Sequence, residues 1–426
     1  MISPWHPALH SMGDCPSGAN LDGAFPFLLN GFSMGPVPPS ANGDVEGWLP
    51  DRFLTRDEHA ITPVAISPGW LPQAPLKLSN GSLVRPAERR MRFTDAVDWL
   101  RQPSSPREEP RPYLRFVSLD SLPGLAGALP LQGALKAIGA TSLQAANLLL
   151  GNGRLSSGLH FDDRDNLLLQ LRGAKSVLLV PPSVLPELNF SSWEERRWVL
   201  HERRLRPPLH HGLSFAGTVR SGRPPVENHS PLEPFALSTG VEAGVDGLVS
   251  ERHAAGGPAE QARQLSLIAR HGLRCTLLAG SALFIPALWA HAVASTDNPA
   301  GRAEPGATTG PPVPSTAPSA LNGAVNLWYT RGIESFDAAV RAAPRFPQAH
   351  MARGDALRTL GRQAEAAAAY ALAARWTDPS GGLEAYRVYE ATKRRGLSLV
   401  NADAGRAGGA GGEVGGKAAA STGGGD

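Results

Sequence analysis

The sequence predicts a mainly β protein, an antiparallel sandwich or barrel with long insertions, followed by a short helical segment. Short apolar runs are separated by turn residues, and long stretches rich in Gly, Pro and Ser lie between them. After residue 331 the apolar residues recur three and four positions apart, which is typical of helices. Gly (47) and Pro (39) together make up about a fifth of the 426 residues, whereas their average combined usage is roughly 12%. Only part of the chain is therefore expected to be compact.

The expected strands are apolar and β-branched runs that end at turn residues. Gly173, Gly280 and Pro286 supply the clearest of these turns. A helix is expected at residues 93–100, with Thr94 as a candidate N-cap. The predicted strands are residues 61–66, 146–150, 166–171, 176–180, 274–278, 282–285, 290–295 and 324–330.

Composition divides the chain into four parts. The compact part is expected at residues 46–330, with its core at 85–330, and segments without a hydrophobic period at 207–258 and 297–320 are predicted insertions. The remaining parts are an irregular N-terminal segment at 1–45, a helical extension at 331–400 and a disordered tail at 401–426.

The helical extension resembles the tetratricopeptide repeat. Phe336 precedes Tyr370 by the 34 residues of that repeat, and Ala339 precedes Ala373 by the same distance. Residues 384–395 form a candidate capping helix. The small and bulky residues that fit the repeat pattern are Gly354, Leu357, Gly361, Ala366, Tyr370 and Ala373.

The charge balance gives no sign of a nucleic-acid-binding field, because Lys and Arg (41) barely outnumber Asp and Glu (38). One arginine cluster stands out beside glutamates, and we expect a solvated helix face there. Its members are Arg196, Arg197, Arg203, Arg204 and Arg206.

The two cysteines, Cys15 and Cys275, argue against a disulfide scaffold and a Cys-rich zinc site, and Cys275 is expected to be a small buried apolar residue. No apolar run is long enough to span a membrane, and no cationic residue precedes Arg52. These features predict a soluble intracellular protein, cytoplasmic or nuclear.

The residues that carry chemistry are two histidines and one aspartate. His160 and Asp162 are two positions apart, so their side chains point to the same face of an extended strand. His291 lies in another predicted strand. Two histidines and a carboxylate on one face form the triad that binds Fe(II) and leaves coordination positions open for oxygen chemistry. His-x-Asp alone is a weak signal in a chain with 12 histidines.

The surrounding residues resemble the JmjC, or cupin-like, 2-oxoglutarate-dependent oxygenases, most closely their small protein hydroxylases. The resemblance covers about residues 85–330. It implies a double-stranded β-helix (jelly-roll, cupin-like) core with flanking helices. The matching segments are AANLLLGNGRLSSGLHFDDRDNLLLQLRGAKSVLLVPP at 145–182, GSALFIPALWAHAV at 280–293 and AVNLWY at 324–329.

The resemblance implies that His160, Asp162 and His291 are the catalytic residues that hold Fe(II). It also implies that Lys175 pairs with the distal carboxylate of the cosubstrate 2-oxoglutarate, as a buried dianion needs a fixed cation.

Other residues would complete the cosubstrate pocket: Ser157 would donate to the same carboxylate, and Asn166, Asn326 and Tyr113 would line the pocket. Read without the family, Lys175 is a solvated residue at a strand start and Ser157 forms a local turn bond. In the same reading the two asparagines end strands, and Tyr113 packs in the core.

The remaining candidates are given structural roles or none. Trp289 and Trp328 are expected to pack beside the metal strand. No metal role is assigned to the histidines His201, His210, His211, His229, His253 and His271, most of which fall in the predicted insertion at 207–258.

The implied function is hydroxylation of a protein side chain, with Fe(II), 2-oxoglutarate and O2 as cofactor and cosubstrates. An RNA nucleoside, as in tRNA, and a histone lysine to be demethylated are alternative substrates within the family. A non-catalytic scaffold that binds partners through its helical repeats is an alternative of another class, and a metal-bound isomerase cupin would use more histidines. No membrane partner is expected, and the oligomeric state stays open.

Overall fold

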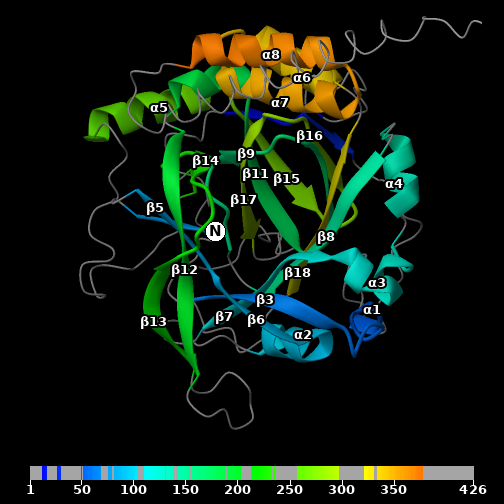
Figure 1. The fold of residues 1–426 in the computed structure, drawn as a ribbon. Helices are drawn as coiled ribbons and strands as arrows, with labels where there is room; N and C mark the ends of the chain where they lie inside the picture. Colours follow the sequence, from blue (N-terminus) through cyan, green and yellow to red (C-terminus); the bar gives the residue numbers. More distant parts are fainter. Residues whose placement is uncertain are drawn as a thin grey trace, which may run out of the picture. The chain divides into compact units, whose positions relative to one another are not determined.

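In the computed structural model, the part of the chain that ends at Pro344 has a β core with helices on its outer side (Figure 1). None of the described helices is long and apolar enough to cross a membrane. The structure describes residues 12–16, 26–29, 49, 51–68, 75–78, 81–102, 110–129, 131–138, 140, 142–152, 155–188, 190–202, 213–232, 234–235, 257–296, 321–330 and 333–377.

The first sheet has ten described strands. All neighbouring pairs are antiparallel except β1 with β15 and β12 with β5. In spatial order the strands are β1 (Gly13–Asp14), β15 (Leu273–Leu278), β11 (Ala174–Val180), β17 (Ala290–Thr296), β9 (His160–Phe161), β14 (Val226–His229), β12 (Ser191–Glu202), β5 (Ser82–Arg85) and β4 (Leu76–Lys77), with β13 (Leu213–Arg220) also paired to β12.

The second sheet has eight described strands and is antiparallel throughout. Its strand β10 is buried along nearly its whole length, because side chains on both of its faces are covered. The spatial order is β2 (Phe27–Leu29), β16 (Ala282–Ile285), β10 (Asp165–Arg172), β18 (Leu321–Thr330), β8 (Ser142–Asn152), β7 (Arg111–Ser118), β3 (Ile61–Ser67) and β6 (Ala87–Arg92).

The two sheets face each other across an apolar layer. Leu168 of the second sheet packs in one cluster with Val177 and Leu277 of the first. Helices cover the other face of the second sheet, where Phe93 and Leu100 pack in a larger cluster with strand residues (Figure 1). The described helices before Arg345 are α1 (Asp51–Leu54), α2 (Phe93–Arg101), α3 (Pro123–Ala126), α4 (Leu131–Ala137), α5 (Gly257–His271) and α6 (Glu334–Ala342). Two 3-10 turns, η2 (Leu119–Ser121) and η3 (Pro182–Glu187), lie among them.

Each strand predicted from the sequence is confirmed, as is the helix at 93–100. Gly173 joins β10 to β11 with a positive φ of 72°, a conformation that glycine adopts at no steric cost. Thr94 is not the N-cap of α2. Arg92 holds that position, and the Thr94 hydroxyl instead donates to the carbonyl of Glu58 at 3.2 Å.

The N-terminal segment is not wholly irregular. Its short strand β1 pairs with β15 and its strand β2 pairs with β16. Cys15 and Cys275 form a disulfide with a Cα–Cα distance of 5.0 Å, which corrects the prediction that Cys275 is only a small apolar residue. Two cysteines far apart in the sequence gave no sign of this pairing, because only the parallel pairing of β1 with β15 brings them together.

The predicted insertion at 207–258 also contains regular structure. Its strand β13 pairs with β12, and β14 pairs with both β12 and β9. Arg196 and Arg197 lie on β12 and not on a helix, because cross-strand partners, such as Thr218 for Arg196, satisfy their guanidinium groups. Arg203, Arg204 and Arg206 lie outside the described residues, as do residues 297–320.

The chain divides into two compact units, Met1–Pro344 and Arg345–Asp426. The described part of the second unit is a helix pair, α7 (Pro347–Thr359) and α8 (Gln363–Trp376). Gly354 lies against Tyr370, since a Cβ at Gly354 would come within 2.6 Å of the ring. The assignment of this pair to a tetratricopeptide repeat and the domain boundaries stay predictions, and the candidate capping helix and the tail at 401–426 lie outside the described residues.

Candidate metal centre

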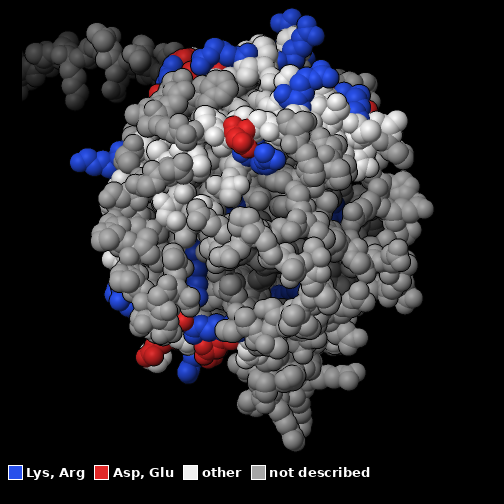
Figure 2. Space-filling model, turned by 180° about the vertical axis from the view of Figure 1, so that it is seen from behind, with Lys and Arg blue, Asp and Glu red and all other residues white. Residues whose placement is uncertain are grey.

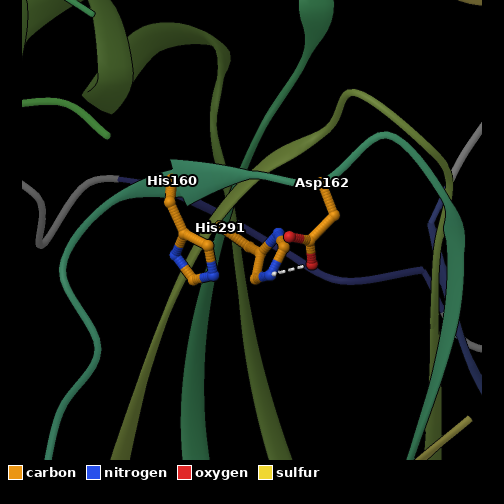
Figure 3. Close-up of side chains that lie close together, drawn as sticks. All are labelled: His160, Asp162 and His291. Carbon is orange, nitrogen blue, oxygen red and sulfur yellow. Dashed lines mark ion pairs between the residues drawn. The ribbon is translucent and has the colours of Figure 1, made fainter. Parts of the chain in front are cut away.

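His160, Asp162 and His291 meet where strands β9 and β17 pair. His160 lies directly opposite His291 in the register of the two strands, and Asp162 follows β9 by one residue. One ligand atom from each of the three lies within 4.8 Å of the others. Figure 3 shows the three side chains pointing into the same space, with His291 Nε2 at 3.6 Å from a carboxylate oxygen of Asp162.

Backbone carbonyls orient both histidine rings. His160 Nδ1 lies 2.8 Å from the carbonyl oxygen of Gly158, and His291 Nδ1 lies 3.1 Å from that of Trp289. A proton on each Nδ1 serves these hydrogen bonds and leaves both Nε2 lone pairs for a metal ion, as second-shell partners do in metal sites. Burial lowers the pKa of His160 well below its usual value, with a further lowering from His291, so this ring is neutral near pH 7.

The turn between β16 and β17 fixes the position of Asp162. The backbone N–H of Leu288 donates to the carbonyl oxygen of Asp162 at 2.8 Å, and that of Ala287 donates to the Asp165 carboxylate at 2.9 Å. Leu288 adopts a left-handed φ of 65°, which is rare for a leucine and is held by this tight turn. The second metal strand therefore begins at a fixed place beside the first.

The triad borders a pocket between the two sheets. Its empty volume, including the open mouth, is about 750 Å³. Every residue predicted for the site from the sequence lines this pocket. These residues are Tyr113, Ser157, His160, Asp162, Asn166, Lys175, His291 and Asn326.

Lys175 is the buried cation of this pocket, with only 3% of its surface exposed. Its ammonium group donates to the Ser295 hydroxyl at 3.1 Å, and no carboxylate pairs with it among the described residues. Burial lowers the pKa of Lys175 to about 8. A buried ammonium group without a counter-ion is costly, so the site is suited to an anion.

The predicted polar neighbours have partners that hold them in place. Ser157 Oγ accepts a 2.9 Å hydrogen bond from the backbone N–H of Val293, so its hydroxyl proton is available to another acceptor. The Asn326 side-chain amide donates to Asn166 Oδ1 at 2.9 Å, while its own side-chain carbonyl oxygen is buried with no partner in the part of the chain that the structure describes. Burial raises the pKa of Tyr113 to about 12, which keeps its phenol a hydrogen-bond donor.

The two tryptophans differ in position. Trp289 packs in the apolar layer between the sheets. Trp328 lines the pocket, where its ring is tilted by 37° against the Phe116 ring with centroids 5.4 Å apart. Its indole N–H is buried and has no hydrogen-bond partner among the described residues.

Among the pocket residues that sequence reasoning missed are Arg115 and Phe116 of β7 and Ser295 of β17. Arg115 lies with its guanidinium carbon 4.8 Å from the Phe116 ring centroid. A charged residue next to a large apolar one in an alternating strand gives no sign that both face one cavity, because alternation places them on opposite faces.

His229, a histidine to which the sequence analysis assigns no metal role, lies in a strand beside the triad. It lies on β14 opposite His160, and the two rings stack with centroids 5.0 Å apart. The ring is buried and its Nδ1 has no partner. Among the described residues it is not part of the ligand cluster.

The donor set and its surroundings fit an iron ion with an anionic cosubstrate. Two imidazoles and one carboxylate suit Fe(II), and the buried ammonium group of Lys175 suits a carboxylate across the pocket.

A model of the cupin-like domain family matches residues 42–335, which include every described strand of the two sheets except β1 and β2. No curated protein matches the chain.

Proposed function

The chain belongs to the cupin-like domain family, and on that premise we propose that it is an Fe(II)- and 2-oxoglutarate-dependent dioxygenase that hydroxylates a protein side chain. The observation that carries the proposal is the cluster of His160, Asp162 and His291 at the pocket wall. Lys175, a buried cation that pairs with no carboxylate among the described residues, lines the same pocket and favours a cosubstrate with a carboxylate at its far end.

The residues of the pocket have distinct tasks in this proposal. His160, Asp162 and His291 would hold the metal ion at the pocket wall. Lys175 binds the distal carboxylate of 2-oxoglutarate, and Ser157 and Tyr113 donate hydrogen bonds to the cosubstrate. Bound iron supplies the oxygen chemistry, in which oxidative decarboxylation of 2-oxoglutarate to succinate and CO2 is coupled to hydroxylation of the substrate.

The apolar walls exclude water from the reacting centre. Leu149, Leu168, Ile285 and Val293 line the pocket between the polar residues. With few water molecules near the metal, oxidising power is directed at the substrate and not at solvent. The resemblance to small protein hydroxylases favours a protein side chain over an RNA nucleoside or a methylated lysine.

Metal binding and succinate formation test the proposal together. We expect the protein to bind one equivalent of Fe(II), measured by equilibrium dialysis without oxygen, and to form succinate from 2-oxoglutarate in air. His160→Ala should lose both properties. His201→Ala is the matched control, because His201 is an exposed histidine on β12, and it should keep both.

The substrate class is tested by mass spectrometry of cell proteins incubated with the enzyme. A side chain that gains one oxygen atom with the natural sequence, but not with His160→Ala, supports protein hydroxylation. Modified RNA nucleosides or demethylated lysines in place of this product would move the assignment to the other family reactions. Absence of Fe(II) binding would contradict the enzyme proposal altogether.

A further inference from the structure

Two consecutive residues of β7, Arg115 and Phe116, both line the pocket. Successive residues of a regular strand point to opposite faces. The register of β7 against β8 shifts between Leu114 and Val117, and Phe116 has a φ of 54°. The strand is therefore bulged at this place, and the bulge redirects the two side chains.

This bulge is an unusual backbone arrangement. A phenylalanine in the left-handed region is a conformational outlier, and such strain is concentrated at functional sites. The ring it places is 38% exposed, although it is large and apolar. It lies beside Trp328, which also lines the pocket, so the two rings form an aromatic wall that is open to an incoming group.

Arg115 is the cation at this wall. Burial lowers its pKa to about 10, with a further lowering from Arg85, so the group is charged near pH 7. Among the described residues it forms no ion pair, whereas the neighbouring Arg85 is paired with Glu195 at 2.9 Å. Arg164, whose guanidinium carbon lies 5.9 Å from the Trp328 ring centroid, has Asp163 at 3.5 Å.

The charges of the occupied pocket leave Arg115 without a counterpart. In the proposed function, the positive charges of Fe(II) and Lys175 together equal the negative charges of Asp162 and the 2-oxoglutarate dianion. The remaining charged residue that lines the pocket is Arg115. A desolvated cation is stable when it meets an anion with matching hydrogen-bond geometry, so the missing partner is one negative charge on the substrate.

The described residues on one face of the molecule, the face opposite to that seen in Figure 1, give less support to a polynucleotide. Figure 2 shows that the Lys and Arg side chains of the described residues on that face lie in several separate groups, some beside Asp or Glu. A continuous basic track, which follows a phosphate backbone in single-strand binders, is not seen among these residues. A short acidic peptide needs only one or two fixed cations.

We propose that Arg115 and Phe116 form the specificity contact of the pocket and select a protein substrate with an aspartate or glutamate at the reacting position. Arg115 binds the substrate carboxylate, and Phe116 with Trp328 packs against the aliphatic part of the substrate. This inference rests on the proposed function, since it assigns the substrate class of the same pocket.

Peptide binding tests the inference without turnover. The probes are pools of short labelled peptides with mixed flanking residues and a fixed central Asp, Glu, Asn, Gln or Lys, and a mixed-sequence RNA oligomer. The protein is loaded with Mn(II) and 2-oxoglutarate, and binding is followed by fluorescence anisotropy. We expect the Asp or Glu pool to bind at least about tenfold more tightly than the corresponding amide pool. This factor corresponds to the free energy that is usually lost when a hydrogen bond to a charged group is removed.

Variants of Arg115 test whether this residue causes the preference for acidic over amide peptides. Arg115→Met should abolish the preference for acid over amide, and Arg115→Lys should keep part of it. Arg90→Met is the matched control, because Arg90 is an exposed arginine on β6, and it should bind as the natural sequence does. Binding of Mn(II) and 2-oxoglutarate by each variant shows that the pocket is assembled.

Several results would overturn the inference. One is equal binding of the acid and amide pools by the natural sequence, including no binding of any pool. Others are tighter binding of the Lys pool or of the RNA oligomer. Weaker 2-oxoglutarate binding in Arg115→Met, with an unchanged peptide preference, would assign Arg115 to the cosubstrate. If the protein with the natural sequence does not bind Mn(II), this result would instead contradict the proposed function.

Discussion

Lys175 is buried on β11, and the pocket offers its ammonium group one hydroxyl acceptor, Ser295 Oγ. Burial disfavours the charged form, so the pKa of Lys175 falls to about 8. In the proposed function the charged form binds the distal carboxylate of 2-oxoglutarate. Protonation of Lys175 and cosubstrate binding are then thermodynamically linked.

The affinity for 2-oxoglutarate should therefore depend on pH. Below about pH 8 Lys175 is already charged in the empty pocket, and affinity should be constant. Above that pH a proton must be taken up on binding, so the Kd should rise by up to about tenfold per pH unit. Isothermal titration calorimetry on the Mn(II)-loaded protein measures this. In Lys175→Arg the loss of affinity for 2-oxoglutarate should begin at a higher pH. A Kd that stays constant up to pH 10 in the natural sequence would contradict the role of Lys175.

Some site residues follow from sequence motifs and others do not. His160 and Asp162 are predicted by their spacing, and His291 and Lys175 by a resemblance to known motifs. Arg115 and Phe116 are not predicted, because a bulge changes which face a side chain occupies. His229 is not predicted because its position depends on the pairing of β14 with β9.

At the scale of elements, strands with a clear hydrophobic pattern were predicted and strands without one were not. β12 carries a run of charged residues that was interpreted as a helix face. It forms a strand because β5, β13 and β14 pair with it, and Arg85 of β5 pairs with its buried Glu195. Cross-strand partners of this kind are distant in sequence, so a local pattern does not reveal them.

The disulfide between Cys15 and Cys275 attaches the N-terminal strand β1 to β15. It joins residues 260 positions apart, and closing a loop of that length restricts the unfolded chain strongly, by about 5 kcal/mol in the chain-entropy model. We expect a reducing agent to lower the Tm, measured by differential scanning calorimetry, by several degrees. Cys15→Ser/Cys275→Ser should melt at the lower temperature with or without reductant.

A Tm that is the same under oxidising and reducing conditions would show that the bond adds nothing to stability. If the reductant still lowers the Tm of the double variant, the reductant acts on something other than this disulfide.

At the scale of the whole molecule, the metal centre joins segments that are distant in the chain. His160 and His291 come from strands that pair only in the folded state, so an ion bound by both stabilises the native structure and not the unfolded chain. At a free ion concentration of one hundred times the Kd, such binding adds about 2.7 kcal/mol to the free energy of unfolding.

Mn(II) should therefore raise the Tm by several degrees, and a chelator should reverse the change. Thermal unfolding followed by circular dichroism measures the effect. His160→Ala should show no shift, whereas His201→Ala should show the full one. An equal shift in both variants would mean that the ion binds outside the triad.

The sequence alone determined the mainly β class, the strands with a hydrophobic pattern and the three candidate metal ligands, because period-two alternation, the His-x-Asp spacing and the motif around His291 are local properties. The tertiary structure decided the pairing of the charged strand β12, the Cys15–Cys275 bond and the shared pocket of Arg115 and Phe116. Each of these depends on strand register and on contacts between residues far apart in the chain, and neither is a property of neighbouring residues.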